Sequence, residues 1–238
     1  MIPLKDMTPR RSFPAMTLLL IAANVAVFVY QLSLPPHAAR TLIDTYGLVP
    51  HKIQLALAGH RYTLQQAFVP FLTCMFLHGG FLHIIGNMLF LWIFGGNVED
   101  MFGAFPYLFF YLVCGIGSGL TQVLFSWGSH VPSIGASGAI SGVLGAYIIF
   151  FPRGRILTLV PLIVIWWMFR VPAFIFIGLW FVLQFLSGLN SLDPRFAAAA
   201  GGVAWWAHVG GFLLGIAIAV HLRAKKSARR HFKPNFNA

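Results

Sequence analysis

Long apolar runs alternate with short polar segments along most of this chain, and the runs have the length of membrane-spanning helices. The first run, Met16–Leu34, is long enough to cross a bilayer and ends at two prolines. Five further apolar stretches follow, at Phe81–Val98, Ala104–Phe125, Ile134–Phe151, Pro172–Leu189 and Val203–Leu222. The pattern therefore predicts six spans, of which Ile134–Phe151 is short.

Two segments do not have the pattern of a span. Residues 35–77 mix charged residues and histidines with scattered apolar positions, which predicts a long loop with short amphipathic helices on the membrane surface. The apolar run Ile156–Phe169 is bracketed by arginines and is too short for a normal span. We expect it to form an interfacial or re-entrant piece.

Composition supports a polytopic membrane protein of the all-α class. The chain is 58% hydrophobic and only 9% charged, with a mean hydropathy of +0.80, values that a soluble domain does not have. A net charge of +11 in a soluble protein would suggest a nucleic-acid partner. Here the charges lie mostly in the termini and one internal loop, so we expect contact with the lipid bilayer and no nucleic acid.

The lysines and arginines predict the orientation of the spans. Twelve lie in the two tails and the 153–170 loop, and four lie in the loops at 35–77 and 190–202. Positive charge favours the cytosolic side, so both termini are expected there. The predicted organisation is a cytosolic tail at 1–14, a membrane domain at 15–222 and a basic cytosolic tail at 223–238. The oligomeric state is left undetermined.

This topology gathers polar residues near one face of the membrane. The second, fourth and sixth spans all start on the outer side, and His78, His83, Ser137 and His208 lie at those starts. Polar groups inside a membrane are costly and often functional. The topology therefore predicts a site opening to the outer face.

Ser137 is the candidate nucleophile. It lies near a predicted helix start in Gly135-Ala136-Ser137-Gly138, where small neighbours let a substrate approach and free N–H groups suit a developing oxyanion. The alternative is helix packing, because Gly138-x-x-x-Gly142 and Ser141-x-x-x-Gly145 are small-xxx-small patterns.

His208 is the candidate general base. It precedes Gly211-x-x-x-Gly215, which is again a pattern for close packing. If this face meets the glycine face of the fourth span, a hydrogen bond between Ser137 and His208 becomes feasible, as acyl transfer needs. The alternative is a structural histidine bonded to a backbone carbonyl.

No carboxylate is expected to complete a triad, although the chain has five. Glu99 and Asp100 lie at the wrong membrane face, Asp6 lies in the cytosolic tail, and Asp44 and Asp193 lie in outer loops with no motif. A Ser–His dyad is the simplest scheme, with Ser141 one turn below Ser137 as a neighbouring hydroxyl. His83 and Asn87 share one helix face and can donate two hydrogen bonds to an oxyanion.

Two other kinds of site are disfavoured by the same residues. Metal binding by His78, His83 and His208 lacks an acidic ligand and the His-Glu-x-x-His motif. A proton or ion path usually includes carboxylates, and this core has none. We therefore expect no metal and no cofactor.

Together these motifs resemble the rhomboid family of intramembrane serine proteases. The residues that carry the resemblance are Gly135-Ala136-Ser137-Gly138, Ala207-His208 with Gly210-Gly211 and Gly215, His78 with His83 and Asn87, Gly47-Leu48-Val49-Pro50, Asn97-Val98-Glu99-Asp100, Phe151-Pro152-Arg153, and Pro172-Ala173 with Trp180-Phe181 and Gln184. Their order and spacing cover nearly the whole chain.

The resemblance implies a six-helix core with a water-filled cavity that opens to the outside. It implies Ser137 as nucleophile, His208 as base, and an oxyanion hole from His83, Asn87 and the Ser137 N–H, with His78 shaping the cavity. Substrates would be single-span membrane proteins, entering between the second and fifth spans.

This sequence departs from the family pattern at two places. Val69-Pro70 stands where many members have Trp-Arg, so the anchoring of the first loop is expected to differ. Ser141 stands where members often have an aromatic residue that stacks on the base, which leaves open how His208 is held. One alternative function is a non-proteolytic membrane-protein binder or retrotranslocation factor on the same scaffold. The other is a small-solute channel or transporter.

Overall fold

A bundle of helices makes up most of the computed structural model, which describes residues 1–162, 165–193 and 203–231. Five helices are long and apolar enough to cross a membrane: α1 (Ala15–Ser33), α6 (Phe81–Phe102), α7 (Ala104–Phe125), α9 (Ala173–Ser191) and α11 (Trp205–His231). The predicted polytopic helical membrane fold is therefore confirmed. The fourth predicted span is α8 (Ser137–Phe150), which has 14 residues and falls short of a normal span.

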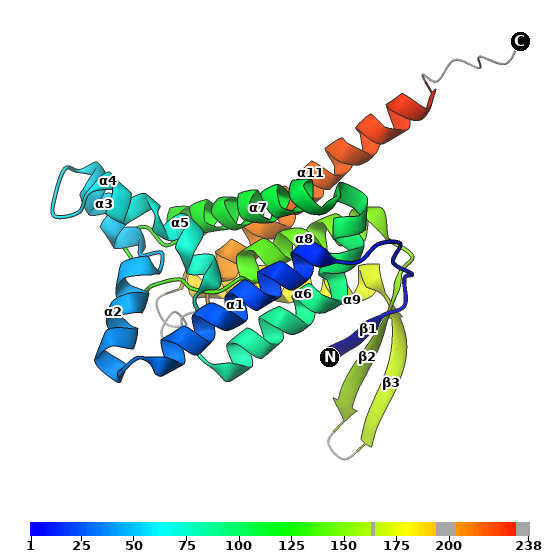
Figure 1. The fold of residues 1–238 in the computed structure, drawn as a ribbon, viewed down its shortest axis with the longest axis horizontal. Coiled ribbons are helices and arrows are strands. Elements are labelled where there is room, and N and C mark those ends of the chain that lie inside the picture. The colour runs from blue at the N-terminus through cyan, green and yellow to red at the C-terminus, as the bar shows by residue number, and fades with distance from the viewer. Residues whose placement is uncertain (163–164, 194–202, 232–238) are drawn as a thin grey trace, which may run out of the picture.

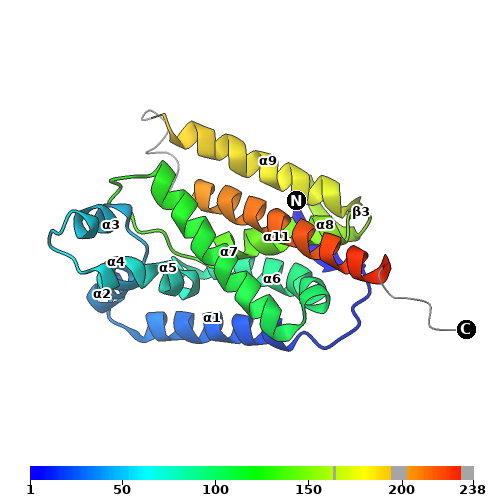
Figure 2. The same ribbon diagram turned by 90° about the horizontal axis from the view of Figure 1, so that it is seen from above.

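The short helix α8 lies at the centre of the bundle, between α6, α7 and α11 (Figures 1 and 2). Every residue from Gly138 to Tyr147 is buried. Protein rather than lipid surrounds this helix, so its length does not have to match the thickness of the bilayer. Its first residue is Ser137, which places the candidate nucleophile inside the protein.

The glycines of α8 and α11 face each other, as the small-residue patterns predicted. A Cβ atom at Gly215 would lie 2.1 Å from the carbonyl oxygen of Gly142, and one at Gly211 would lie 2.1 Å from that of Gly138. Only glycine permits this approach of the two backbones. The close contact fixes the depth of α11 relative to α8, and with it the height of His208 beside Ser137.

Replacing Gly215 by Ala is expected to destabilise the protein by about 1–3 kcal/mol, the usual cost of overpacking a close contact. Thermal unfolding in detergent measures the loss. Gly178→Ala on α9 is the matched control, because a Cβ atom there meets nothing within 4 Å. Equal melting temperatures for the two variants would contradict the role of the α8–α11 contact.

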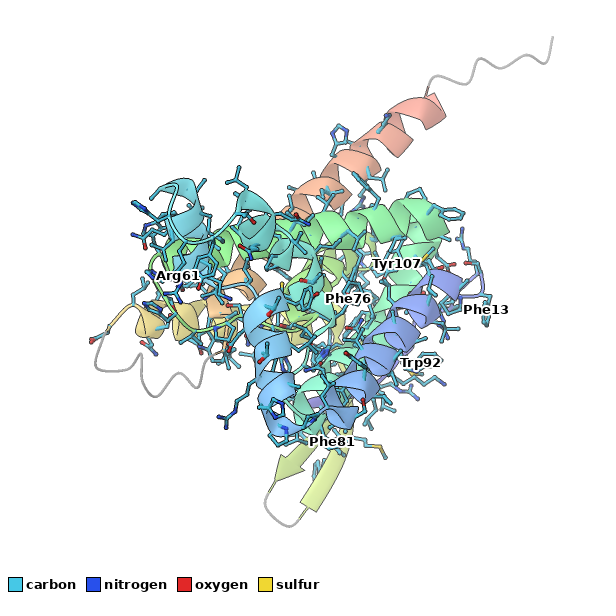
Figure 3. The ribbon with its side chains drawn as sticks, turned by 60° about the vertical axis from the view of Figure 1, so that its left-hand side comes forward. Phe13, Arg61, Phe76, Phe81, Trp92 and Tyr107 are labelled. Carbon is cyan, nitrogen blue, oxygen red and sulfur yellow. The ribbon has the colours of Figure 1, made fainter. Side chains whose placement is uncertain are left out.

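The segment between α1 and α6 folds into short helices, as predicted for residues 35–77. They are α2 (Pro36–Tyr46), α3 (Pro50–Leu57), α4 (Leu64–Phe68), α5 (Pro70–Thr73) and the 3₁₀ turn η1 (Cys74–Phe76). They gather at one end of the bundle, opposite the end where α1 begins and α11 finishes (Figure 1), as the positions of Arg61 and Phe13 in Figure 3 also show.

A three-stranded antiparallel sheet lies at the other end and was not predicted. Strand β2 (Arg155–Leu162) pairs with β3 (Ile165–Pro172), and β1 (Ile2–Asp6) pairs with the free edge of β2. The apolar run Ile156–Phe169, expected to be interfacial or re-entrant, is thus part of a β-hairpin that projects from the bundle (Figure 1). Its isoleucines, valines and aromatic residues suit a strand.

The first 14 residues are folded against the bundle. Asp6 accepts hydrogen bonds from the Tyr147 hydroxyl at 2.7 Å and from the Asn97 amide at 2.5 Å. These bonds join β1 to α8 and α6, so this part of the chain is more than an extended tail.

Glu99 and Asp100, at the end of α6, bind the start of α1. The buried Glu99 carboxylate accepts from the backbone N–H groups of Met16 and Thr17 at 3.0 and 2.9 Å. Asp100 accepts from the N–H groups of Arg11 and Ser12. A carboxylate is well placed there, because the first N–H groups of a helix lack partners and carry partial positive charge. The two acids therefore have a structural role far from the candidate site.

Candidate active site

A glycine with a positive φ angle, Gly135, precedes Ser137 and places it at the start of α8. Gly135 has φ of 120°, a conformation that L side chains rarely adopt, and a Cβ atom there would lie 2.7 Å from Nε2 of His83. The chain therefore turns sharply against α6 before the helix starts. The first-turn N–H groups of α8, beginning with that of Ser137, have no partner within the helix.

The first loop holds this turn in place through backbone hydrogen bonds. Leu48 and Ser133 exchange two such bonds, of 3.0 and 2.8 Å, and the Gly135 N–H donates to the Cys74 carbonyl at 2.9 Å. The loop is thus anchored to the segment before Ser137 although Val69-Pro70 replaces Trp-Arg.

Ser137 and His208 form the central contact of the site. The Ser137 hydroxyl lies 2.8 Å from Nε2 of His208, which comes from the first turn of α11 and is 9% exposed. This is the distance expected of a nucleophile and its general base. The packing alternative for the small residues is also present in the structure, because the glycines beside Ser137 make the α8–α11 contact.

Three side chains surround the ring of His208 from other directions. Nδ1 lies 2.7 Å from the Oε1 atom of Gln184 on α9. Trp180, one turn earlier on α9, and Trp205 on α11 lie with their ring centroids 5.9 and 6.2 Å from that of His208. Contacts from α9 and from α11 itself therefore take the place of the aromatic residue missing at Ser141. The sequence predicted no role in the site for Gln184, which is only part of the Trp180-Phe181…Gln184 pattern there.

His83 and Asn87 lie on the face of α6 that meets the Gly135 turn. The backbone N–H of Gly79 donates to Nδ1 of His83 at 3.3 Å, which leaves the proton of a neutral ring on Nε2, the atom facing Gly135. The Nδ2 atom of Asn87 has no hydrogen-bond partner among the described residues. Both groups are donors beside Ser137, as an oxyanion hole requires.

One cavity of about 540 Å³ joins these residues. Its lining includes Ser137, His208, His83 and Asn87, and the rest of the wall is largely apolar, with Phe90 from α6, Leu144 from α8 and Trp180 from α9. An apolar cavity with a few convergent polar groups is typical of a site for a peptide or other organic ligand.

His78 and Ser141, the other two candidate residues, do not line this cavity. Ser141 donates to the carbonyl oxygen of Ser137 at 2.6 Å, which supports the helix rather than the base. The His78 ring lies edge-on to His83 at 5.1 Å and is 2% exposed, and its backbone forms two hydrogen bonds with the Gln31 side chain. His78 thus lies behind His83.

Acid is expected to destabilise the fold through His78. Burial, aided by the neighbouring His83, lowers the pKa of His78 to about 4, against about 6.5 in an unfolded chain. The unfolded chain binds more protons between these values, so stability falls as the pH drops from about 6.5 towards 4. We expect the melting temperature of His78→Gln in detergent to change less than that of the wild type between pH 7 and pH 5. An equal drop in both proteins would show that His78 does not contribute.

Comparison with known proteins gives one family. The Rhomboid domain model matches residues 65–225 of this chain. Rhomboid protein 1, mitochondrial, of Saccharomyces cerevisiae is 32% identical over 145 residues, which are 59% of this chain and 38% of the relative.

Two further relatives come from other kingdoms of life. Presenilin-associated rhomboid-like protein, mitochondrial, of Bos taurus is 30% identical over 206 residues, 83% of this chain and 46% of the relative. Rhomboid protease GluP of Bacillus subtilis is 45% identical over 75 residues, 32% of this chain and 14% of the relative. The chain therefore spans less than half the length of each of these three relatives.

Proposed function

The chain belongs to the rhomboid family, and from this premise we propose that it is an intramembrane serine endopeptidase. The observation that carries the proposal is the 2.8 Å contact between the Ser137 hydroxyl and Nε2 of His208, inside a cavity that also holds the donors of His83 and Asn87. A nucleophile, a base and an oxyanion hole are the parts that acyl transfer needs.

The proposed reaction starts when Ser137 Oγ attacks a peptide carbonyl and His208 Nε2 takes its proton. The negative charge that develops on the carbonyl oxygen is stabilised by His83 Nε2–H, the Asn87 amide and the backbone N–H of Ser137, which has no partner within α8. His208 then gives its proton to the leaving amine. Water hydrolyses the acyl-enzyme, again with His208 as the base. Every proton moves between residues of this chain, the substrate and water, so the scheme uses no metal or cofactor.

The substrates we propose are single-span membrane proteins, cut in or near the spanning segment. The cavity has walls from α6, α8, α9 and α11, and these are largely apolar, as suits a segment that leaves the lipid. Trp180 of α9 and residues of α6 both belong to that wall, so entry between α6 and α9 is the proposed path.

The chain is a multi-pass integral membrane protein. We further propose a bacterial plasma membrane as its location, with the tails 1–14 and 223–238 in the cytosol and residues 15–222 as the membrane domain. The proposed orientation rests on the twelve lysines and arginines in the sequence of the two tails and the 153–170 loop. The active site then opens to the outer face.

Labelling by a serine-reactive fluorophosphonate tests the proposed function. Purified wild-type protein in detergent is expected to label, and Ser137→Ala and His208→Ala are expected not to label. A non-proteolytic binder on the same scaffold would leave all three unlabelled beside a control protease that labels in the same detergent. Labelling that survives Ser137→Ala would mean that another serine is the nucleophile.

A further inference from the structure

The imidazole of His208 has a hydrogen-bond partner at each nitrogen. Ser137 lies 2.8 Å from Nε2 and Gln184 Oε1 lies 2.7 Å from Nδ1. Nε2 must be unprotonated to accept the serine proton, so Nδ1 carries the hydrogen of the neutral ring. That N–H needs an acceptor, and the amide oxygen of Gln184 is an acceptor. The two bonds therefore require the same tautomer.

We propose that Gln184 is the positioning residue of the site and holds His208 as the Nδ1–H tautomer with Nε2 aimed at Ser137. This inference deepens the proposed function and rests on it. Gln184 acts through His208 and touches no reacting atom. It takes the place that a carboxylate has in a Ser–His–Asp triad.

The surroundings explain why a neutral amide suits this position. His208 is 9% exposed and lies in the first turn of a membrane-spanning helix, where an ionised carboxylate is costly. Three of the five carboxylates lie elsewhere: Glu99 and Asp100 bind the start of α1, and Asp6 binds Tyr147 and Asn97. An amide oxygen orients the ring without burying a charge.

The packing of α9 on α11 makes the contact possible. Trp180 and Gln184 are four residues apart and so share one face of α9, and both meet His208. From α7, Gln122 accepts a hydrogen bond from the Ala207 N–H, which steadies the turn of α11 that carries His208. The other titratable group that faces His208 among the described residues is His83 on α6, and the neighbours named from α7, α8 and α9 are neutral.

The tautomer of His208 tests the inference without any need for activity. In the Ser137→Ala background, ¹⁵N-histidine NMR of the full chain in detergent is expected to show the Nδ1–H form, with the signal assigned by its loss in His208→Gln. Adding Gln184→Leu is expected to move His208 towards the Nε2–H form, which an imidazole without partners prefers. The same tautomer with Gln and with Leu would overturn the inference, whatever the outcome of labelling by fluorophosphonate.

Kinetics in the active protein give a second readout. Gln184→Leu is expected to lower kcat about tenfold with KM unchanged, the scale of one buried neutral hydrogen bond. Gln184→Glu is expected to move the acid limb of the pH–rate profile to higher pH, because a carboxylate beside Nδ1 favours the protonated ring. Leu183→Ala, an exposed neighbour on α9, is the control and should change neither.

A purely structural role for Gln184 predicts a different result. Both variants would then lose thermal stability, and His208 would keep the same tautomer with Gln and with Leu at position 184. That outcome would overturn the inference and leave the Ser137–His208 dyad intact. If Gln184→Leu fails to fold, the pH–rate profile of Gln184→Glu still tests the inference. An acid limb at higher pH supports the contact with Nδ1, and an unchanged acid limb contradicts it.

Discussion

Replacing Ser137 by Ala is expected to abolish cleavage of a transmembrane substrate, and replacing His208 by Gln is expected to lower the rate by about 10⁴-fold or more. The serine supplies the only hydroxyl within reach of His208 Nε2 among the hydrogen bonds of the described residues. Without the histidine, the hydroxyl has no group to take its proton. Because the two act as a unit, the double variant should be no slower than the slower single variant.

The measurement is cleavage of a single-span substrate by protein reconstituted in vesicles, with unfolding followed in parallel. Ser33→Ala, an exposed serine at the end of α1, is the matched control and should retain the wild-type rate. Full activity of Ser137→Ala would contradict the mechanism. Loss of activity together with loss of the fold would be visible in the unfolding curve and would call for Ser137→Cys, which keeps a nucleophile of similar size.

Replacing Asn87 by Ala is expected to lower kcat by about 10²-fold while KM stays near the wild-type value. The Asn87 Nδ2 group has no partner among the described residues, so its removal breaks no hydrogen bond that this donor makes there. In the proposed mechanism Asn87 Nδ2–H donates a hydrogen bond to the oxyanion of the transition state. Removing one such donor lowers kcat by about 10²–10³-fold. An interaction made only in the transition state appears in kcat and not in KM.

The comparison that isolates this effect is with Asn190→Ala, an exposed asparagine at the end of α9. Asn87→Asp adds a second check, because it keeps the size and removes the N–H donor. If Asn87→Ala keeps the wild-type kcat, Asn87 is not in the oxyanion hole, and the dyad remains as proposed. An increase in KM alone would instead indicate a role in substrate binding.

The sequence by itself determined the helical membrane fold and the approach of α8 to α11. The length of an apolar run can be read directly from the sequence. A long apolar segment in lipid forms a helix, because its backbone N–H and C=O groups must then be hydrogen-bonded within the segment. The run Ala104–Phe125 therefore agrees with α7 at both ends, and three other long spans agree within four residues. The last predicted span ends at Leu222, whereas α11 continues to His231. A close backbone contact is possible only where both helices carry glycine, as they do at 138, 142, 211 and 215. The pairing of α8 with α11 could therefore also be predicted from the sequence. That pairing brought Ser137 and His208 into one hypothesis.

Only the tertiary structure decided which side chains meet across helices that are distant in the sequence. Ile156–Phe169 is apolar enough for several conformations, and pairing with residues 2–6 selected the strand. Gln184 looks like any polar residue in an apolar helix until α9 packs on α11 and brings its amide to His208. His78 and His83 belong to the same sequence pattern, yet the ring of His78 is buried behind the cavity wall. In each case the outcome depends on packing between segments that are far apart in the chain. Local composition and periodicity carry no information about which distant segments pack together.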